Sequence, residues 1–296
     1  MKIFDMHIHS NCQKPDPKGL LEKMDNAGIS GGCVFSERPI NLFSKIGATF
    51  SERLENVLLW TKDNKNELFP IMWVHPEEPN IIKNVQIASE RGIAGFKIIC
   101  NNFYAGDKHS IKLISAIAEL KKPVIFHSGI LWDGAISSSY NRPLSFESLI
   151  HIKGLRFALA HCSWPWYDEC IALYGKFLNA YIENPDSAEM FFDITPGTPA
   201  IYREDLFTKL FTIGYDVPDN IMFGTDGNAD NYSAAWSKEW IERDNAIYDK
   251  LGVKEDTRKK IYGENLLRFL GKKEKNFTHL SPTTDDANRW TVDTVR

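Results

Sequence analysis

The most restrictive feature of this sequence is a regular alternation of two kinds of segment. Eight short runs are rich in β-branched and aromatic residues, and each is followed by a loop and by a segment with helical spacing of apolar residues. Most of the runs are almost continuously apolar, which is typical of strands that are buried on both faces. The pattern therefore predicts parallel strands separated by helices. The runs occupy residues 2–7, 32–36, 69–74, 94–99, 123–127, 156–161, 190–194 and 221–225.

The number of strand–helix units selects an architecture within the α/β class. In the segment SIKLISAIAEL, one helical face carries the apolar residues Ile111, Ile114, Ile117 and Ala118. Eight such units are the number that closes a (β/α)8 TIM barrel. A doubly wound open sheet is the competing architecture, but no glycine-rich phosphate-binding turn follows an early strand. We therefore expect a (β/α)8 barrel.

The length of 296 residues suits a single barrel domain. We expect this domain to span residues 1–271, because the last helical stretch, TRKKIYGENLLRFLG, ends at Gly271. Residues 272–296 lose the periodicity and become polar. They predict a C-terminal tail that either packs over the barrel through Phe277 and Trp290 or stays mobile.

Residues with metal-binding and acid–base chemistry stand at the ends of the first, fifth, sixth and eighth predicted strands. Each has an ordinary explanation on its own, such as a chance HxH triplet, a hydrogen-bonded core histidine or an Asx turn. In a (β/α)8 barrel, however, the carboxyl ends of all strands meet at one mouth. Their joint occurrence at strand ends therefore predicts a single site. The residues are His7, His9, His127, His161 and Asp226.

The spacing of His7 and His9 suits a shared cation. Residues two apart in a strand point to the same face, so both imidazoles are expected to face the inside of the barrel. Imidazole and carboxylate groups are ligands that Zn²⁺ and similar ions accept. We expect the two histidines, His127 and Asp226 to hold one divalent cation that acidifies a water molecule and polarises a substrate carbonyl group. Asp226 could accept a proton from that water, and His161 would act as general acid or base.

Several stretches of the chain resemble the amidohydrolase superfamily of metal-dependent barrels, and in particular its amidohydrolase 2 branch. They are DMHIHS, GFKII, SYNRPLSFESL, LAHCSWPWYDECIAL, FFDIT, IMFGTDGN and IYGENLLRFLG, and together they span residues 1–271. That branch contains aminocarboxymuconate semialdehyde decarboxylase, resorcylate-type decarboxylases and dicarboxylate lactonases. The resemblance implies a mononuclear site, commonly zinc with manganese as the alternative, held by the four ligands named above. It also implies that His161 is the catalytic imidazole beside the metal.

Lys97, on the fourth predicted strand, leaves a second arrangement open. In binuclear members of the superfamily, a carboxylated lysine on strand four bridges two metals, and the histidines of strands five and six bind the second metal. Lys97 lies short of the predicted strand end, so we favour the mononuclear arrangement and expect Lys97 to bind substrate. Asp5, on the same predicted inward face as His7, is expected to support the metal site from below without binding the metal.

The predicted ligands serve both hydrolysis and non-oxidative decarboxylation. Arg142, in the loop after the fifth strand, is expected to hold a substrate carboxylate, and Arg38 after the second strand is the weaker candidate. Trp132 is expected to wall an apolar or planar substrate. We therefore expect a hydrolase of a small carboxylated lactone, ester or amide. The alternatives are a decarboxylase of an aromatic or muconate-type acid and, third, a barrel that binds a ligand without catalysis.

The composition argues against other classes of function. A formal net charge of −4 without a basic stripe does not suit nucleic-acid binding. The N-terminus lacks the apolar core of a signal peptide, and no apolar run approaches the roughly 18 residues that cross a bilayer. We therefore expect a cytoplasmic enzyme with a small-molecule substrate; the resemblance adds a homo-oligomer as a candidate state. Five scattered cysteines without CxxC spacing predict free thiols: Cys12, Cys33, Cys100, Cys162 and Cys170.

Overall fold

A computed structural model describes residues 1–11, 13–39, 48–62, 64 and 67–273. Cys12, Phe277 and Trp290, whose roles the sequence predicts, lie outside the described residues. The four described cysteines, at positions 33, 100, 162 and 170, are buried free thiols, as predicted.

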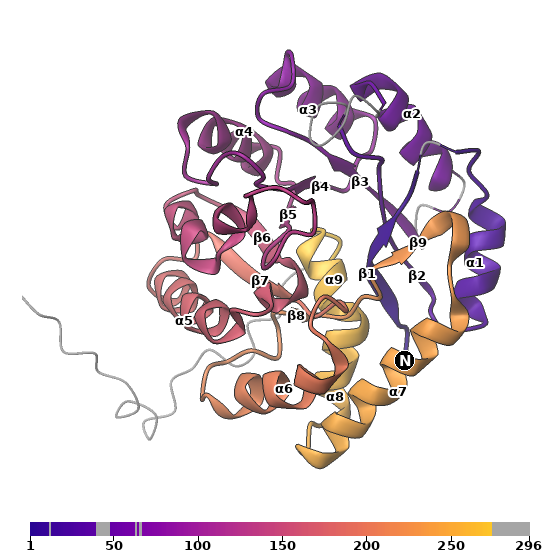
Figure 1. The fold of residues 1–296 in the computed structure, drawn as a ribbon, viewed down its shortest axis with the longest axis vertical. Coiled ribbons are helices and arrows are strands. Elements are labelled where there is room, and N and C mark those ends of the chain that lie inside the picture. The colour runs from indigo at the N-terminus through magenta and orange to yellow at the C-terminus, as the bar shows by residue number, and fades with distance from the viewer. Residues whose placement is uncertain (12, 40–47, 63, 65–66, 274–296) are drawn as a thin grey trace, which may run out of the picture.

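Nine strands form one parallel sheet in the described part of the chain (Figure 1). Their order in the sheet is β8-β7-β6-β5-β4-β3-β2-β1-β9. All eight predicted strands are present, with small differences at their ends. The strands are β1 (Phe4–His9), β2 (Gly31–Phe35), β3 (Leu68–Trp73), β4 (Gly95–Ile98), β5 (Val124–Phe126), β6 (Arg156–Leu159), β7 (Glu189–Asp193), β8 (Ile221–Met222) and β9 (Gly227–Asn228).

β8 and β9 are the two ends of a single segment that closes the sheet. β8 pairs with β7, and β9 pairs with β1. Between these pairings, the backbone amide of Met6 in β1 donates a hydrogen bond to the carbonyl of Phe223 at 3.0 Å. The eighth segment therefore lies between the first and seventh strands, and the predicted (β/α)8 barrel is confirmed.

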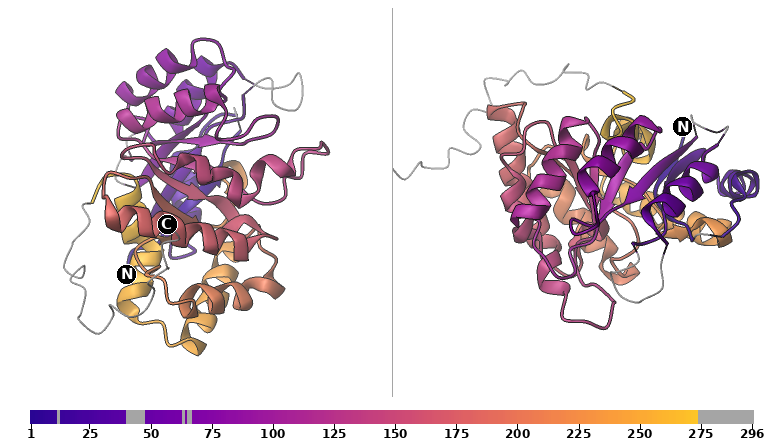
Figure 2. Two further views of the ribbon diagram at one scale, coloured as in Figure 1. Left: turned by 90° about the vertical axis from the view of Figure 1, so that its left-hand side faces the viewer. Right: turned by 90° about the horizontal axis from the view of Figure 1, so that it is seen from above.

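Helices surround the sheet (Figure 2). α4 buries Ile114, Ile117 and Ala118, which belong to the apolar face predicted from the sequence. α2 begins with a capping box in which Thr49 and Glu52 satisfy each other's backbone amides. The described α-helices are α1 (Pro17–Asp25), α2 (Phe50–Trp60), α3 (Ile81–Glu90), α4 (Lys108–Glu119), α5 (Tyr167–Glu183), α6 (Arg203–Thr212), α7 (Ala234–Lys250), α8 (Glu255–Lys259) and α9 (Asn265–Phe269).

The connection from β5 to β6 departs from the predicted alternation of strands and α-helices. It contains two 3₁₀ turns, η1 (Ser138–Asn141) and η2 (Pro143–Leu149), in place of an α-helix. Pro143 opens η2 and cannot donate a backbone hydrogen bond, and the serines before it favour turns. The long loop that precedes these turns lies at the mouth of the barrel.

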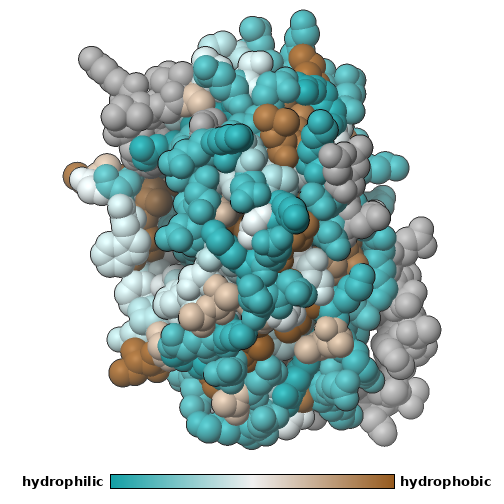
Figure 3. Space-filling view, turned by 90° about the vertical axis from the view of Figure 1, so that its right-hand side faces the viewer, coloured by the Kyte–Doolittle hydropathy of each residue, from teal (hydrophilic) through white to brown (hydrophobic). Residues whose placement is uncertain are grey.

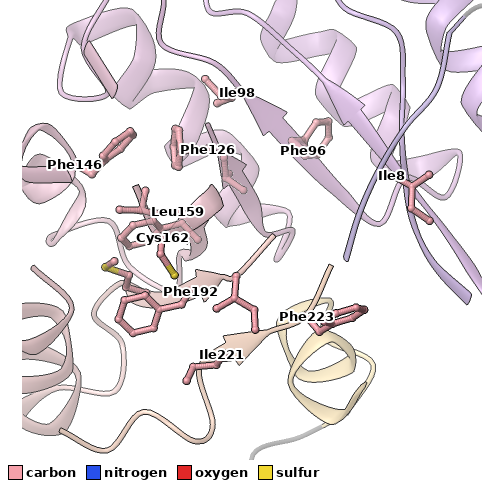
Figure 4. Packing of buried hydrophobic residues seen from close by; sticks show 14 of the residues in the cluster. Ile8, Phe96, Ile98, Phe126, Phe146, Leu159, Cys162, Phe192, Ile221 and Phe223 are labelled. Atoms are coloured by element: carbon pink, nitrogen blue, oxygen red, sulfur yellow. The ribbon is translucent and has the colours of Figure 1, made fainter. Parts of the chain in front are cut away.

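Apolar side chains fill the barrel and also separate it from the helices. Inside the barrel, residues of the strands pack with Leu266 and Phe269 of α9. Arg268 of α9 pairs with Glu189, the first residue of β7, so α9 closes the amino-terminal end of the barrel. Figure 4 shows part of the outer layer, which lies between strands and helices; its labelled members include Ile8, Phe96, Phe126, Phe146, Leu159 and Phe223.

The surface that carries α1 and α7 is mainly hydrophilic, and its apolar side chains are scattered (Figure 3). None of the described helices combines the length and the apolar character that a membrane span requires.

Candidate active site

Three side chains converge where β1 meets the eighth strand segment. His7 and His9 come from β1, and Asp226 lies between β8 and β9. Nε2 of His7 is 3.2 Å from Nε2 of His9. Oδ1 of Asp226 is 3.5 Å from the first of these nitrogens and 3.3 Å from the second. Among the described residues, these three form a group whose potential ligand atoms all lie within 4.8 Å of one another.

The three distances fit a tetrahedral metal site. Zn²⁺ binds nitrogen and oxygen donors at about 2.0–2.1 Å, so two donors of a tetrahedral site lie about 3.3 Å apart. The separations of 3.2, 3.3 and 3.5 Å are close to that value. Two imidazoles and a carboxylate are also donor types that such an ion accepts. His7, His9 and Asp226 can therefore hold a divalent cation with little rearrangement.

A register shift in β1 gives the two histidines their direction. The pairing of β1 with β2 shifts between Asp5 and Ile8. Met6 packs in the interior cluster and Ile8 packs in the outer layer, although strict alternation would place both on one face. The ring of His7 contacts Phe35 of the interior cluster, with 4.5 Å between ring centroids.

The same shift corrects the predicted placement of Asp5. Asp5 does not share the inward face with His7, because the alternation changes between them. Its carboxylate instead accepts hydrogen bonds from the backbone amide of Thr225 at 2.9 Å and from the hydroxyl of Tyr232 at 2.8 Å. Burial raises the pKa of Asp5 to about 6. Asp5 is buried and stays outside the three-donor group, so it supports the eighth segment beside the site.

Asp226 adopts a backbone conformation that is unusual for a residue with a side chain. Its φ of 53° lies in the left-handed region, which costs about 1–3 kcal/mol for most residues other than glycine. Burial opposes ionisation of Asp226, but the hydrogen bond with His9 and the electrostatic interactions with His161 and His7 outweigh it, so the pKa of Asp226 lies well below its usual range. The strained turn thus presents an ionised carboxylate to the two histidines.

His7 is oriented by a carboxylate for which the sequence analysis gives no role. Oδ2 of Asp193, the last residue of β7, accepts a hydrogen bond from Nδ1 of His7 at 2.7 Å, and both side chains are buried. The backbone amide of Thr195 donates to the other oxygen of Asp193 at 2.8 Å. Metal-binding histidines commonly donate their second ring N–H to a carboxylate in this way. Asp193 ends the strand in the FFDIT stretch. Polar residues at strand ends are expected to meet at the barrel mouth, and the same expectation for the seventh strand would have identified Asp193.

Lys97 of β4 reaches the same group of donors. Its side chain is buried, and Nζ lies 3.5 Å from Nε2 of His7. Burial lowers the pKa of Lys97 to about 8, although the carboxylates of Asp193 and Asp226 oppose this shift. The structure therefore brings Lys97 to the site. Its role, as a substrate contact or as a bridging carboxylated lysine, stays a prediction.

His127 lies beside the donors without joining them. Its ring centroid is 5.3 Å from that of His161. Nε2 of His127 is 3.1 Å from the carbonyl of Ile130, and because a carbonyl can only accept, Nε2 carries the proton. Nδ1 of His127 is left as the nitrogen with a free lone pair. Since His127 is not in the three-donor group of the described residues, its role as fourth ligand stays a prediction.

A left-handed turn directly after β6 places His161. Three consecutive residues, His161, Cys162 and Ser163, have φ values of 60°, 44° and 61°. Such runs cost energy and concentrate at functional sites. Nδ1 of His161 lies 2.9 Å from the hydroxyl of Thr195. Burial lowers the pKa of His161 to about 4, so its imidazole is neutral at pH 7.

A cavity of about 680 Å³ lies at the mouth of the barrel, and its lining includes His7, His9, Lys97, His127, His161 and Asp226. One wall of the cavity is apolar, because Trp73, Ile99 and Leu131 pack there as a small separate cluster. Arg38, in the loop after β2, and Lys97 add positive charge to the lining. This combination suits a small carboxylate with an apolar or planar body.

Two of the three predicted substrate contacts line the cavity. Lys97 lies at the donor group, and Trp132 lies at the rim, where it is 82% exposed. Arg142 is not among the lining residues, because its Nε donates to Glu169 at 2.8 Å on the outer surface. Arg38, the weaker candidate from the sequence, lines the cavity instead.

Comparison with known proteins gives a family model and a shared fold. The amidohydrolase model Amidohydro_2 matches residues 40–272. No curated protein matches the chain. A 2,6-dihydroxybenzoate decarboxylase from Rhizobium is similar with a TM-score of 0.62 at 13% identity, over 92% of this chain and 99% of that one.

Two further solved structures are similar to the chain. A probable 2-pyrone-4,6-dicarboxylic acid hydrolase from Acinetobacter baumannii has a TM-score of 0.59 at 12% identity, over 92% of this chain and 100% of that one. A 5-carboxyvanillate decarboxylase from Novosphingobium aromaticivorans, complexed with manganese, has a TM-score of 0.60 at 12% identity, over 91% and 96% of the two chains. At these identities the likeness concerns the fold alone.

Proposed function

This chain belongs to the amidohydrolase family, and on that premise we propose that it is a metal-dependent hydrolase of a small carboxylated lactone, ester or amide. The proposal assigns His7, His9 and Asp226 as metal ligands, with His127 as the fourth. When bound, a divalent cation supplies Lewis acidity that polarises a substrate oxygen and acidifies a water molecule. The donor types and their separations support zinc. Manganese is the alternative, since one of the similar structures contains it.

The position of Asp226 is the observation that carries the hydrolytic proposal. Its carboxylate lines the cavity, and its Oδ1 lies 3.3 Å from Nε2 of His9 and 3.5 Å from Nε2 of His7. An ionised carboxylate at this place can accept a proton from an attacking water molecule. His161, neutral and directed into the same cavity, is the second group that can take or give a proton there.

Substrate recognition follows from the lining of the cavity. We assign Arg38 and Lys97 to the substrate carboxylate, because both present positive charge to the cavity. Trp132 would cover the apolar side of the substrate from the rim. Arg38 takes the role predicted for Arg142, because Arg142 is engaged with Glu169 outside the cavity.

Hydrolysis is tested with zinc-loaded protein and a panel of lactones, esters and amides that carry a carboxylate, by following proton release. We expect turnover of at least one panel member, and a fall in kcat of about 10²–10⁴-fold in Asp226→Asn, since the proton acceptor is lost. Asp230→Asn is the matched control, because Asp230 lies outside the cavity lining and accepts from the amide of Asn11. Equal losses in both variants would remove the proposed role of Asp226.

A metal count separates the mononuclear site from the binuclear one. We expect about one zinc ion per chain after dialysis against zinc. Two ions per chain, with the second lost in Lys97→Met, would instead support a bridging carboxylated lysine.

Decarboxylation is the second candidate function, and the apolar wall of the cavity favours it. Trp73, Ile99 and Leu131 present a surface that suits an aromatic ring. CO₂ release from dihydroxybenzoates or carboxyvanillate, abolished in Asp226→Asn and without proton release from the hydrolase panel, would replace the hydrolase by a decarboxylase. Absence of both activities in zinc-loaded protein would leave a barrel that binds without catalysis.

A further inference from the structure

We propose that a second cavity, at the amino-terminal end of the barrel, binds the phosphate group of a small phosphorylated molecule. This basic cavity has a volume of about 470 Å³, and its lining includes Arg156, Tyr181, Glu189, Arg268 and Lys273. Arg156 and Glu189 are the first residues of β6 and β7, so the basic cavity lies at the opposite end of the barrel from the three-donor group. The inference goes beyond the proposed function and does not depend on it.

Positive charge prevails in the lining of the basic cavity. Arg156, Arg268 and Lys273 contribute three cationic groups, and Glu189 contributes the one carboxylate among the described lining residues. The lining therefore has an excess of two positive charges. Guanidinium groups match the geometry of phosphate oxygens, and a phosphate monoester carries a charge of about −1.5 to −2 at pH 7. A phosphate group compensates this excess better than a single carboxylate does.

The two arginines of the basic cavity differ in their partners. Nη1 of Arg268 lies 2.7 and 2.8 Å from the two carboxylate oxygens of Glu189, so the charge of Arg268 is already compensated. Arg156 donates from Nη2 to the carbonyl of Lys121 at 2.7 Å. In the described part of the chain, Nε of Arg156 has no hydrogen-bond partner and no carboxylate forms an ion pair with this guanidinium. A bound anion would supply the counter-charge that Arg156 lacks.

The surroundings of Arg156 add to the positive potential. Burial lowers the pKa of Arg156; the carboxylate of Glu189 opposes this shift, and the charge of Arg268 adds to it. Burial also lowers the pKa of Lys122, and the charges of Lys272 and Arg156 lower it further. These cationic groups therefore repel one another, and a bound anion would relieve the repulsion.

The end of α9 brings Lys273 to the basic cavity. Gly271 has a φ of 70°, and the amide of Lys272 donates to the carbonyl of Leu267 at 2.8 Å, so the helix ends in a Schellman motif. Gly271 also packs against the guanidinium of Arg156, because a Cβ atom at this position would be 3.1 Å from Nη2. The turn thus keeps the space beside Arg156 open and directs the chain toward Lys273.

The basic cavity is larger than a phosphate ion requires. Beside the charged groups, its lining includes the apolar side chains of Leu155 and Pro185 and the partly buried ring of Tyr181. Apolar and aromatic side chains of this kind contact the organic part of a small ligand, while a few polar groups fix its orientation. A phosphorylated small molecule therefore fits the basic cavity better than free phosphate.

Isothermal titration calorimetry with phenyl phosphate, inorganic phosphate and acetate tests the site. We expect about one phenyl phosphate per chain, with a Kd on the order of 1 mM or tighter. The same binding should occur in zinc-loaded and in chelator-treated protein, because the basic cavity is remote from the three-donor group. Inorganic phosphate should bind more weakly than phenyl phosphate. Acetate should bind more weakly still, by about tenfold or more, since it carries a single charge.

Variants of the cationic groups show where the probe binds. Arg156→Gln should weaken phenyl phosphate binding by about 10–100-fold, since a hydrogen bond to a charged group is lost. Lys273→Gln should weaken it by about two- to fivefold, because the exposed Lys273 contributes less. Arg91→Gln is the matched control, since it removes the same charge from an exposed pair with Glu55. Its Kd should stay within about twofold of the native value.

Three results would overturn the proposal: no saturable binding of phenyl phosphate in the millimolar range, binding that requires zinc, or native affinity in Arg156→Gln. Acetate bound as tightly as inorganic phosphate would contradict the preference for a doubly charged group. Equal affinity for phenyl phosphate and inorganic phosphate would make free phosphate the ligand and contradict the role of the apolar lining.

Circular dichroism of each variant shows whether it has folded. If Arg156→Gln has not folded, Lys273→Glu takes its place, because Lys273 is partly exposed and its replacement disturbs no buried contact. This reversal of charge should weaken phenyl phosphate binding more than Lys273→Gln does, and equal affinities in the two variants would overturn the proposal. None of these readouts requires turnover, so an inactive protein that binds phenyl phosphate would refute the proposed function and leave the phosphate site standing.

Discussion

At the scale of the residue, two neighbouring imidazoles are expected to have separate roles. The ring centroids of His7 and His161 are 5.3 Å apart, but only His7 belongs to the three-donor group of the described residues. We expect His7→Ala to lose zinc and turnover together, and His161→Ala to retain zinc and lose turnover. Metal analysis of the purified variants and the activity assay check this pair. Zinc loss in His161→Ala would place His161 among the ligands.

The absence of a side chain at Gly197 is a second feature of single residues that matters to the site. A Cβ atom at this position would lie 2.4 Å from Cγ and 2.7 Å from Nδ1 of His161. Gly197→Ala should therefore displace the imidazole, and a displacement of about 1 Å lowers turnover by about 10²-fold. Steady-state kinetics measure this effect, and zinc content should stay near that of the native protein.

Gly154→Ala is the control for Gly197→Ala. Gly154 has a φ of 67°, and a Cβ atom there would meet nothing within 4 Å. Gly154→Ala should lower the free energy of unfolding by about 1–2 kcal/mol, because a residue with a Cβ atom is strained in this left-handed conformation. Turnover should not change. Activity within twofold of the native value in Gly197→Ala would show that the ring accommodates the methyl group.

The residues of the site differ in how far the sequence predicts them. His7, His9 and Asp226 follow from the rule that strand ends meet at the barrel mouth, because a polar residue after an apolar run is visible in the sequence. The same rule does not predict the direction in which the side chain of a loop residue points. Arg142 and Arg38 both follow strands, yet the first is taken by Glu169 and the second lines the cavity. Only the folded arrangement of the loops decides between them.

At the scale of the element, the sequence predicts strands well and their irregularities poorly. Runs of apolar residues mark the eight predicted strands, but alternation alone does not reveal the shift in β1 that separates Asp5 from His7. Periodicity also cannot show that the eighth strand divides into β8 and β9 at a left-handed Asp226. Both irregularities lie at the site, where local geometry follows the needs of the donors and departs from ideal strand geometry.

The contact between α6 and α7 carries a prediction about stability. Arg203 of α6 is fully buried and donates to Asp244 of α7 at 2.8 and 2.7 Å, and it also donates to the carbonyl of Ile194. Asp244→Asn leaves the guanidinium without its counter-charge. We expect the free energy of unfolding to fall by about 3–5 kcal/mol, as measured by urea denaturation of the metal-free protein.

Asp249→Asn is the matched control for that substitution. Asp249 pairs with Arg258 at 2.7 Å, but the carboxylate is 72% exposed. Removing an exposed pair costs less than about 1 kcal/mol. Equal losses in the two variants would mean that the buried pair contributes no more than a surface pair.

At the scale of the whole molecule, the proposed metal ligands join the two segments that close the barrel. His7 and His9 belong to β1, and Asp226 lies between β8 and β9, which pairs with β1. A ligand that binds only the folded state stabilises it by about 2.7 kcal/mol at a hundredfold excess over Kd. We expect zinc to raise the midpoint of thermal unfolding of the native protein and to leave that of His7→Ala unchanged. Calorimetry with and without zinc measures both, and an equal rise in the two proteins would place the stabilising zinc elsewhere.

The cavity also divides the barrel into two arcs. The three-donor group and the carboxylate of Asp193 behind it come from β1, β7 and the eighth segment. The apolar wall comes from the other side of the barrel: Trp73 ends β3, Ile99 follows β4, and Leu131 lies in the loop after β5. Substitutions in the wall leave the contact between His7 and Asp193 untouched. Substitutions at these positions can therefore change substrate preference while the three-donor group keeps its geometry. A library of variants for directed evolution should begin at these three wall positions.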